Sequence, residues 1–288
     1  MSVIALATVI ALGVWAAMAG ATAPTATTGQ APAYLALGGS ASVGFQPTAT
    51  HPHGTPTDRG YTNDLVIAAR AHWPHLSLTS LGCPGASTST VLDGGGRCRY
   101  PGGSQLAAAV HFLHRHHTTR LITVDLGFND IGLCLHHTAV DESCVVRGLA
   151  EVQHQLPLIV GDLRAAAGNG TAIVGVGHYD PYLAQMTHGP ASRHFADLTL
   201  VAITRLDQTL SSIYARFGVP MAGVLARFES TDSNLVTVGS RRIPADEERI
   251  CQWTWMCSPG PLGPNIHPND SGYVAIAEAI SAVLPPSS

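Results

Sequence analysis

Apolar residues after position 32 fall into short continuous runs, and most of these runs are followed by a longer stretch with helical spacing. The runs expected to form strands cover residues 34–37, 76–81, 121–126, 171–176 and 219–224. The stretches expected to form helices cover residues 63–72, 104–117, 145–167, 191–217 and 268–284. Strands that alternate with helices build a parallel sheet, and continuously apolar strands are typical of a sheet covered on both faces. The pattern predicts a single α/β domain, in three α/β/α layers around a five-stranded parallel sheet.

The first 23 residues are apolar almost throughout and contain two Ala-x-Ala patterns, at 19–21 and 21–23. This predicts a secretory signal peptide. No Arg or Lys precedes the run, and its length would also span a bilayer, so a retained N-terminal anchor is the alternative. Residues 24–32 are rich in Pro, Thr and Ala and are expected to be a flexible linker, with the globular domain covering residues 33–288.

Composition excludes several chemistries. Charged residues make up 12% of the 288 positions, about half the usual share of roughly 25%. The sequence contains no Lys, so Schiff-base and Walker-type phosphate chemistry are excluded. The net charge is −4 and the Arg residues are scattered, with no run longer than two, which argues against a nucleic-acid partner.

Six cysteines occur as three sequential pairs separated by long stretches without cysteine. None has Cys-x-x-Cys spacing, which disfavours a zinc or thioredoxin-like site. Sequence alone leaves several connectivities open, and short loops favour local pairing: Cys83–Cys98, Cys134–Cys144 and Cys251–Cys257. Three structural disulfides would fit an exported protein, with buried free thiols in a cytosolic enzyme as the alternative.

Ligands of parallel α/β sheets bind beyond the carboxyl ends of the strands, so the residues that follow the strands are the candidates for chemistry. Ser40 follows two glycines after the first strand, Gly82 follows the second strand and Asn129 follows the third. His267 precedes the last helix, which is expected to begin at Pro268. A serine, a histidine, an amide and a glycine N–H fit acyl transfer. Each residue alone is also typical of an ordinary turn or cap.

The four segments together resemble the SGNH hydrolases, also called GDSL esterases and lipases, and most closely their secreted actinobacterial branch. The matching blocks are Gly38-Gly39-Ser40, Leu81-Gly82-Cys83-Pro84-Gly85, Gly127-Phe128-Asn129-Asp130 and His267-Pro268-Asn269-Asp270-Ser271-Gly272-Tyr273. The resemblance runs from about residue 34 to residue 283. It implies a flavodoxin-like SGNH hydrolase fold, and three local disulfides also occur in that branch.

Carried over residue by residue, the resemblance makes Ser40 the nucleophile and His267 the general base and acid. The oxyanion hole would consist of the N–H groups of Ser40 and Gly82 and the side-chain amide of Asn129. The resemblance implies no metal and no organic cofactor.

Two acidic positions of the family are missing. Gly39 replaces the Asp of the first block, where glycine would permit unusual backbone angles. Pro264 replaces the Asp that normally orients the histidine. We therefore expect the backbone carbonyl of Pro264 to orient His267, with Asp246 or Asp270 as alternatives.

Other side chains could complete the site. The segment His178-Tyr179-Asp180-Pro181 follows the fourth expected strand and could shape the substrate site. Tyr179, Trp253 and Trp255 are the candidates for the substrate pocket, although packing explains the two tryptophans equally well. His111 and His114 are neighbours on one expected helix, but no acidic or Cys partner accompanies them, and a solvated helix end is favoured over a metal site.

The sequence thus predicts a secreted, monomeric serine esterase or lipase that acts on a small-molecule or lipid ester, without nucleic acid and with a cell-envelope association left open. The alternatives are a catalytically weak or inactive envelope binding protein of the same fold, an acyltransferase and a polysaccharide deacetylase.

Overall fold

The computed structural model describes residues 30–136 and 138–284. The predicted signal peptide or anchor, and most of the linker, lie outside the described residues. Within the described ranges, no helix has the length and apolar character needed to cross a membrane.

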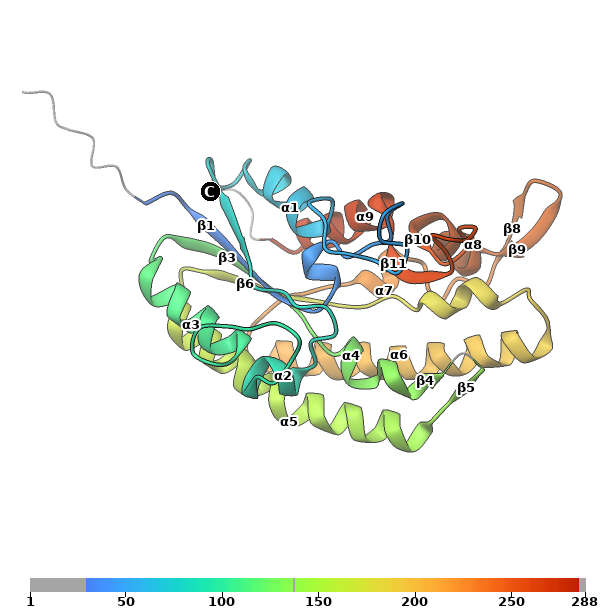
Figure 1. Cartoon of the computed structure of the whole chain (residues 1–288), viewed down its shortest axis with the longest axis horizontal. Helices are drawn as coiled ribbons and strands as arrows, with labels where there is room; N and C mark the ends of the chain where they lie inside the picture. Colours follow the sequence, from blue (N-terminus) through green and yellow to red (C-terminus); the bar gives the residue numbers. More distant parts are fainter. Residues whose placement is uncertain (1–29, 137, 285–288) are drawn as a thin grey trace, which may run out of the picture.

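Five parallel strands form the central sheet (Figure 1). They are β1 (Ala33–Gly38), β2 (Ser77–Ser80), β3 (Thr119–Asp125), β6 (Ala172–Val176) and β7 (Met221–Ala222). Their order across the sheet is β2-β1-β3-β6-β7. β2 lies next to β1 on one side and β3 lies next to β1 on the other. The strand order therefore reverses between β1 and β3. The predicted three-layer α/β/α fold with a five-stranded parallel sheet is confirmed.

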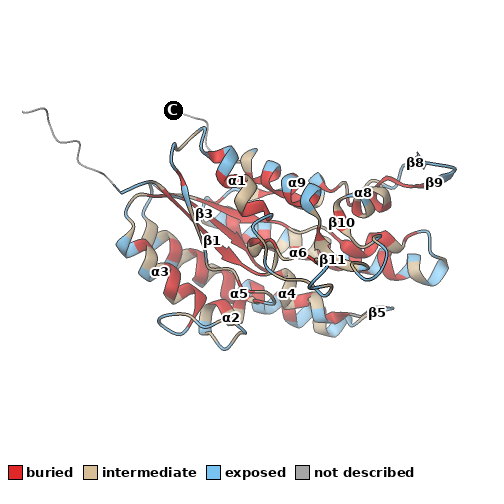
Figure 2. Ribbon diagram, turned by 45° about the horizontal axis from the view of Figure 1, so that its top comes forward, coloured by how far each residue is buried: buried red, intermediate tan, exposed pale blue. Residues whose placement is uncertain are grey.

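Side chains of the central strands alternate between two separate apolar cores. Leu35 and Leu37 of β1 point to one core, and Tyr34 and Ala36 point to the other. All four side chains are fully buried, and Figure 2 shows the sheet buried between helices whose outer faces are exposed. This explains why the strands read as continuous apolar runs: both faces of the sheet are covered.

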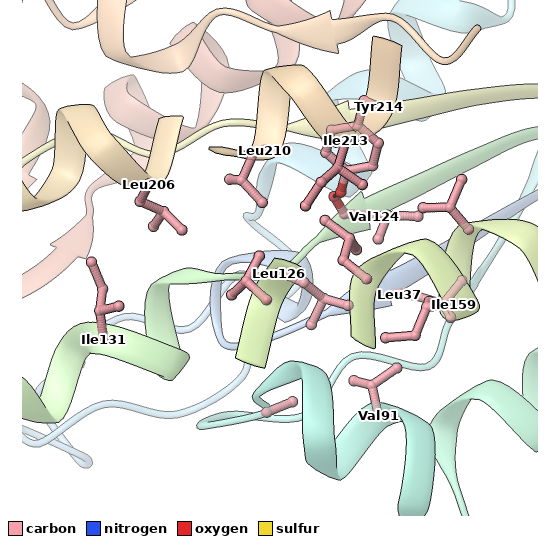
Figure 3. Packing of buried hydrophobic residues seen from close by; sticks show 14 of the residues in the cluster. Leu37, Val91, Val124, Leu126, Ile131, Ile159, Leu206, Leu210, Ile213 and Tyr214 are labelled. Atoms are coloured by element: carbon pink, nitrogen blue, oxygen red, sulfur yellow. Dashed lines mark hydrogen bonds between the residues drawn. The ribbon is translucent and has the colours of Figure 1, made fainter. Parts of the chain in front are cut away.

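Helices cover the two faces (Figure 1). One layer contains α2 (Thr88–Asp93), α3 (Gln105–Arg115), α4 (Phe128–Ile131), α5 (Glu142–Ala167) and α6 (Pro190–Arg216). The other contains α1 (Tyr61–Ala69), α7 (Val224–Arg227), α8 (Ala245–Trp253) and α9 (Asp270–Ser281). Three short 3-10 helices lie in the connections of the described chain: η1 (Ala41–Val43), η2 (Gly132–Cys134) and η3 (Pro181–Gln185). Figure 3 shows Val124 of β3 in the first layer's core, near Ile159 of α5 and Ile213 of α6.

The predicted helices all exist, and the predicted cap of α3 is present: the Ser104 side chain accepts a hydrogen bond from Ala107 N–H. Two boundaries were wrong. The strand expected over 219–224 is only β7, because the chain turns at Gly223 into α7. The last helix does not begin at Pro268, which belongs to a strand; Asn269 caps α9 by accepting from Gly272 N–H.

Three small antiparallel pairs lie outside the central sheet, and the apolar pattern does not predict them. They are β4 (Leu135–His136) with β5 (Ala139–Val140), β8 (Leu235–Val238) with β9 (Arg241–Pro244), and β10 (Thr254–Trp255) with β11 (Asn265–Pro268). The structure pairs the six cysteines locally, as Cys83–Cys98, Cys134–Cys144 and Cys251–Cys257. The last of these disulfides closes the loop that contains β10.

Candidate active site

Ser40 lies in a tight turn directly after β1. Gly38 has a φ of 144°, and a Cβ at this position would lie 2.4 Å from the Asp125 carbonyl oxygen, so only glycine fits there. Gly39 N–H donates to the same carbonyl at 3.1 Å. The turn is thus fixed by the end of β3. The conformation that favours glycine occurs at Gly38 and not, as expected, at Gly39.

His267 faces Ser40 from the other side of the site. It lies in β11, which pairs with β10, and its Nε2 is 3.0 Å from Ser40 Oγ. Its ring also contacts Phe45, with ring centroids 4.7 Å apart. Burial lowers the pKa of His267 to about 4, because a charged imidazolium is poorly solvated there. At neutral pH the imidazole is therefore uncharged and can accept the serine proton.

The partner of His267 Nδ1 is the Asn265 side chain, not the Pro264 carbonyl. Nδ1 lies 2.7 Å from Asn265 Oδ1, and the His267 backbone N–H donates to the same oxygen at 3.1 Å. Because a backbone N–H can only donate, its partner is the amide oxygen, which in turn requires a proton on Nδ1. The lone pair of the ring then lies on Nε2, facing Ser40.

The expectation for Pro264 was wrong because this segment is extended. Residues two apart share a face of a strand, so Asn265 lies beside His267 in β11. Pro264 is exposed and lies outside that strand. The two acidic alternatives bind elsewhere: Asp270 pairs with Arg59 at 2.9 Å, and Asp246 accepts from Glu247 N–H.

Asn129 comes from the first turn of α4, after β3. Its Nδ2 donates to the Ala86 carbonyl at 2.9 Å, which leaves its second amide hydrogen available. A Cβ at Gly39 would lie 2.8 Å from this Nδ2. The missing side chain at position 39 therefore leaves room for the Asn129 amide beside Ser40.

The expected oxyanion donor Gly82 does not line the cavity at Ser40, whereas Gly85 does. A Cβ at Gly82 would meet the buried Ser42 hydroxyl at 2.0 Å, so this glycine is needed for packing against η1. Gly85 has a φ of 83°. Among the hydrogen bonds of the described residues, none uses the N–H of Ser40 or of Gly85. The predicted glycine block therefore reaches the cavity through Gly85 and not through Gly82.

A cavity of about 250 Å³ joins these groups. Its walls are largely apolar and include Phe45, Pro84, Leu126, Phe128, Tyr179, Pro181 and Ile266. Of the three predicted pocket residues, only Tyr179 lines it; its hydroxyl donates to the Ile266 carbonyl at 2.6 Å.

The two tryptophans lie elsewhere. Trp253 packs against Phe228 and below the guanidinium groups of Arg227 and Arg249. Trp255 Nε1 donates to Gln46 at 3.2 Å. Both side chains stabilise the segment around the Cys251–Cys257 disulfide, which is the packing role that the sequence left open.

Three further polar residues line the cavity: Asp125, His178 and Arg97. His178 belongs to the segment 178–181 that was expected to shape the substrate site, whereas Asp125 and Arg97 were not predicted. Asp125 ends β3 and is 5% exposed, and burial raises its pKa. His178 follows β6; its Nδ1 lies 3.8 Å from Asp125 Oδ1 and its Nε2 lies 3.0 Å from the Leu126 carbonyl oxygen. Asp125 comes at a strand end, a position that could have identified it. Arg97 carries no comparable signal.

A metal centre has no support in the part of the chain that the structure describes, where no group of three His, Cys, Asp or Glu side chains is placed to hold an ion. His111 and His114 lie on α3 and do not line the cavity that contains Ser40.

Solved structures with a similar fold include two lipases and a phospholipase. The extracellular lipase of Streptomyces rimosus is 18% identical, with a TM-score of 0.54 over 87% of this chain and 100% of that one. Phospholipase A1 of Streptomyces albidoflavus is 20% identical, with a TM-score of 0.55 over 87% and 100%. The lipase Lip_vut3 from a goat rumen metagenome is 15% identical, with a TM-score of 0.54 over 87% and 96%.

No family model and no curated protein sequence matches the chain. At these identities the structural likeness establishes the fold, which is the one these lipases share. The chemistry of the site has to be argued from its own residues.

Proposed function

We propose that the protein is a secreted serine esterase or lipase of the SGNH type, which hydrolyses carboxylic esters through an acyl-enzyme on Ser40. The observation that carries the proposal is the 3.0 Å contact between Ser40 Oγ and His267 Nε2 inside an apolar cavity. A nucleophile within hydrogen-bond reach of a neutral base is the arrangement that covalent catalysis requires.

In the first half of the reaction, His267 Nε2 accepts the hydroxyl proton as Ser40 Oγ attacks the ester carbonyl carbon. The carbonyl oxygen becomes an oxyanion. The N–H groups of Ser40 and Gly85 and the free amide hydrogen of Asn129 are the donors for it, since no other described group uses them. Fixed donors of this kind stabilise the charge that develops in the transition state.

The tetrahedral intermediate then collapses. The alcohol leaves with the proton from His267 Nε2, and the acyl group remains on Ser40. In the second half, a water molecule gives a proton to Nε2 as its oxygen attacks the acyl carbon. The bond between the acyl carbon and Ser40 Oγ then breaks, Oγ takes the proton back from Nε2, and the carboxylic acid leaves.

Asn265 takes the place that an acidic residue has in a Ser-His-Asp triad. Its Oδ1 accepts the Nδ1 proton at 2.7 Å, which holds the tautomer and the ring orientation that the reaction needs. An Asn performs the same task beside the histidine of papain-like proteases. A neutral amide stabilises the imidazolium less than a carboxylate does, so we expect modest turnover.

Export fits the three disulfides, because such bonds persist in oxidising compartments. The apolar N-terminus supplies the export signal in this proposal, as a cleaved signal peptide.

Hydrolysis of p-nitrophenyl esters of graded chain length tests the proposed function. Wild type should hydrolyse at least one of them, and Ser40→Ala should lose the activity. Ser77→Ala is the matched control, because Ser77 is an exposed serine on β2, away from the cavity. No hydrolysis by wild type at any chain length would contradict the proposal and favour a binding protein of the same fold.

A further inference from the structure

A single cationic side chain lines the cavity that contains Ser40. Among the described residues around this cavity, Arg97 is the one Arg, and the sequence has no Lys. The other ionisable groups there are Asp125, His178 and His267. Burial raises the pKa of Asp125 and lowers that of His267 to about 4, so both groups are biased toward their neutral forms. Arg97 brings a guanidinium group to this lining.

The backbone at Arg97 is closely held. The Cys83–Cys98 disulfide closes the loop that contains it, one residue away. Gly94 packs so closely on the next turn of the chain that a Cβ there would lie 2.3 Å from the Gly103 carbonyl oxygen. The same loop carries Gly85, the proposed oxyanion donor. Arg97 therefore lines the cavity from the same disulfide-closed loop as Gly85.

Arg97 has no partner within the protein as far as the structure describes it: no ion pair or hydrogen bond of the described residues involves its side chain. By contrast, Arg59, Arg205, Arg227 and Arg249 each pair with a carboxylate. A guanidinium offers five N–H donors in a fork that matches phosphate or carboxylate oxygens. At Arg97 these donors are available to a ligand in the cavity.

We infer that Arg97 binds an anionic group of the substrate, so that the preferred substrates are esters with a phosphate or a carboxylate close to the scissile bond. The inference rests on the proposed function and names the substrate class of that site. A mostly apolar pocket with one oriented charged group is the usual composition of a selective ligand site.

Two pairs of soluble esters test the inference and separate the two sources of the charge. Methyl butyrate and monomethyl succinate differ by a carboxylate on the acyl side. Dibutyroylglycerol and dibutyroyl phosphatidic acid differ by a phosphate on the alcohol side. The measured quantity is the ratio of kcat/KM for the charged ester to that for its neutral counterpart, at low ionic strength.

Arg97→Gln should lower this ratio in at least one pair by about 3- to 10-fold, mainly through KM. The effect should shrink at high salt, which screens an exposed charge. Arg99→Gln is the matched control: Arg99 is exposed just after the disulfide-closed loop, two residues beyond Arg97, and does not line the cavity. Equal ratios in wild type and Arg97→Gln for both pairs, or an equal change in Arg99→Gln, would overturn the inference.

A binding measurement separates this inference from the proposed function. Titration calorimetry with dibutyroyl phosphatidic acid and with monomethyl succinate compares Ser40→Ala with Ser40→Ala/Arg97→Gln. Weaker binding of either ligand by the double variant supports the anion site even if wild type hydrolyses none of the four esters, a result that would refute the proposed function alone. If the two variants bind each ligand with equal affinity, the anion site is refuted.

Discussion

Two histidines face the same cavity, and the serine and the carboxylate of a Ser-His-Asp triad lie beside different ones. His267 contacts the serine, and its Nδ1 faces the neutral amide of Asn265 at 2.7 Å. His178 has a carboxylate near its Nδ1, with Asp125 Oδ1 at 3.8 Å, but its Nε2 faces the Leu126 carbonyl at 3.0 Å. A carboxylate beside a histidine is therefore not sufficient to identify the base in this cavity.

The difference separates two requirements of a general base. Position decides which histidine can take the serine proton, and the group at Nδ1 only sets the tautomer and the basicity. His178 fails the first requirement because its Nε2 is directed at a carbonyl oxygen, which needs a donor. His267 meets the first and satisfies the second with an amide. The following variants test this division, in order of expected effect.

Removal of each histidine should have very unequal consequences. His267→Ala should lower kcat by at least about 10³-fold, because the serine loses its proton acceptor. His178→Asn should lower it by less than about 10-fold. Steady-state hydrolysis of a p-nitrophenyl ester, with circular dichroism to confirm folding, measures both. Comparable losses from the two variants would show that the contact with Ser40 does not select the base.

Removal of the amide partner should have an intermediate effect. Asn265→Ala should lower kcat about 10- to 100-fold, since Nδ1 loses the acceptor that fixes its proton and the ring orientation. KM should change little, because Asn265 does not line the cavity. An unchanged kcat would mean that the backbone alone holds His267 in place.

The pH profile should respond to the charge of that partner. Activity needs neutral His267, so kcat/KM of wild type should fall as the pH drops through about 4. Asn265→Asp places a carboxylate beside the ring, which favours the imidazolium and should move this acid limb upward by about 1 to 3 pH units. Asn169→Asp adds the same charge in an exposed loop and serves as the control. If the acid limb of the pH profile in Asn265→Asp stays at its wild-type position, the contact between His267 Nδ1 and the side chain of residue 265 is contradicted.

The smallest expected effect concerns the Asp125–His178 pair. Burial raises the pKa of Asp125, so ionising it weakens the folded state as the pH rises above the unfolded value near 3.8. Asp125→Asn removes this penalty, and its free energy of unfolding relative to wild type should increase between pH 4 and pH 8. The increase should be on the order of 1 kcal/mol for each unit by which the pKa is raised.

Urea unfolding at several pH values measures this increase in the free energy of unfolding. Asp93→Asn, at an exposed carboxyl group, is the control. If the difference in the free energy of unfolding between Asp125→Asn and wild type is constant across that pH range, burial does not raise the pKa of Asp125.

Sequence predicted the sheet well because its strands are buried on both faces. β1 and β3 are continuous apolar runs whose ends bring Ser40 and Asn129 to one edge. β7 was overestimated, since apolar residues of the edge strand continue into the helix beyond Gly223. The pattern also missed β10–β11, two short strands of which β10 lies inside the Cys251–Cys257 loop and β11 follows outside it.

The errors within the site all concern contacts that form only in the folded chain. Asn265 was missed because an offset of three residues to His267 was assumed, whereas the strand conformation of β11 makes the offset two. Gly85 was missed in favour of Gly82 because both belong to one short block, and only the tertiary structure shows which one faces the cavity. Arg97 reaches the site through a disulfide-closed loop, and nothing in the order of residues indicates that approach.

Mass spectrometry of the protein after reaction with a fluorophosphonate tests the central claim most directly, because this reagent forms a covalent adduct only with an activated serine. We predict one adduct, on the peptide that contains Ser40, in wild type and in His178→Asn, and none in His267→Ala. An unlabelled wild type, or an adduct that persists on Ser40 without His267, would contradict the account.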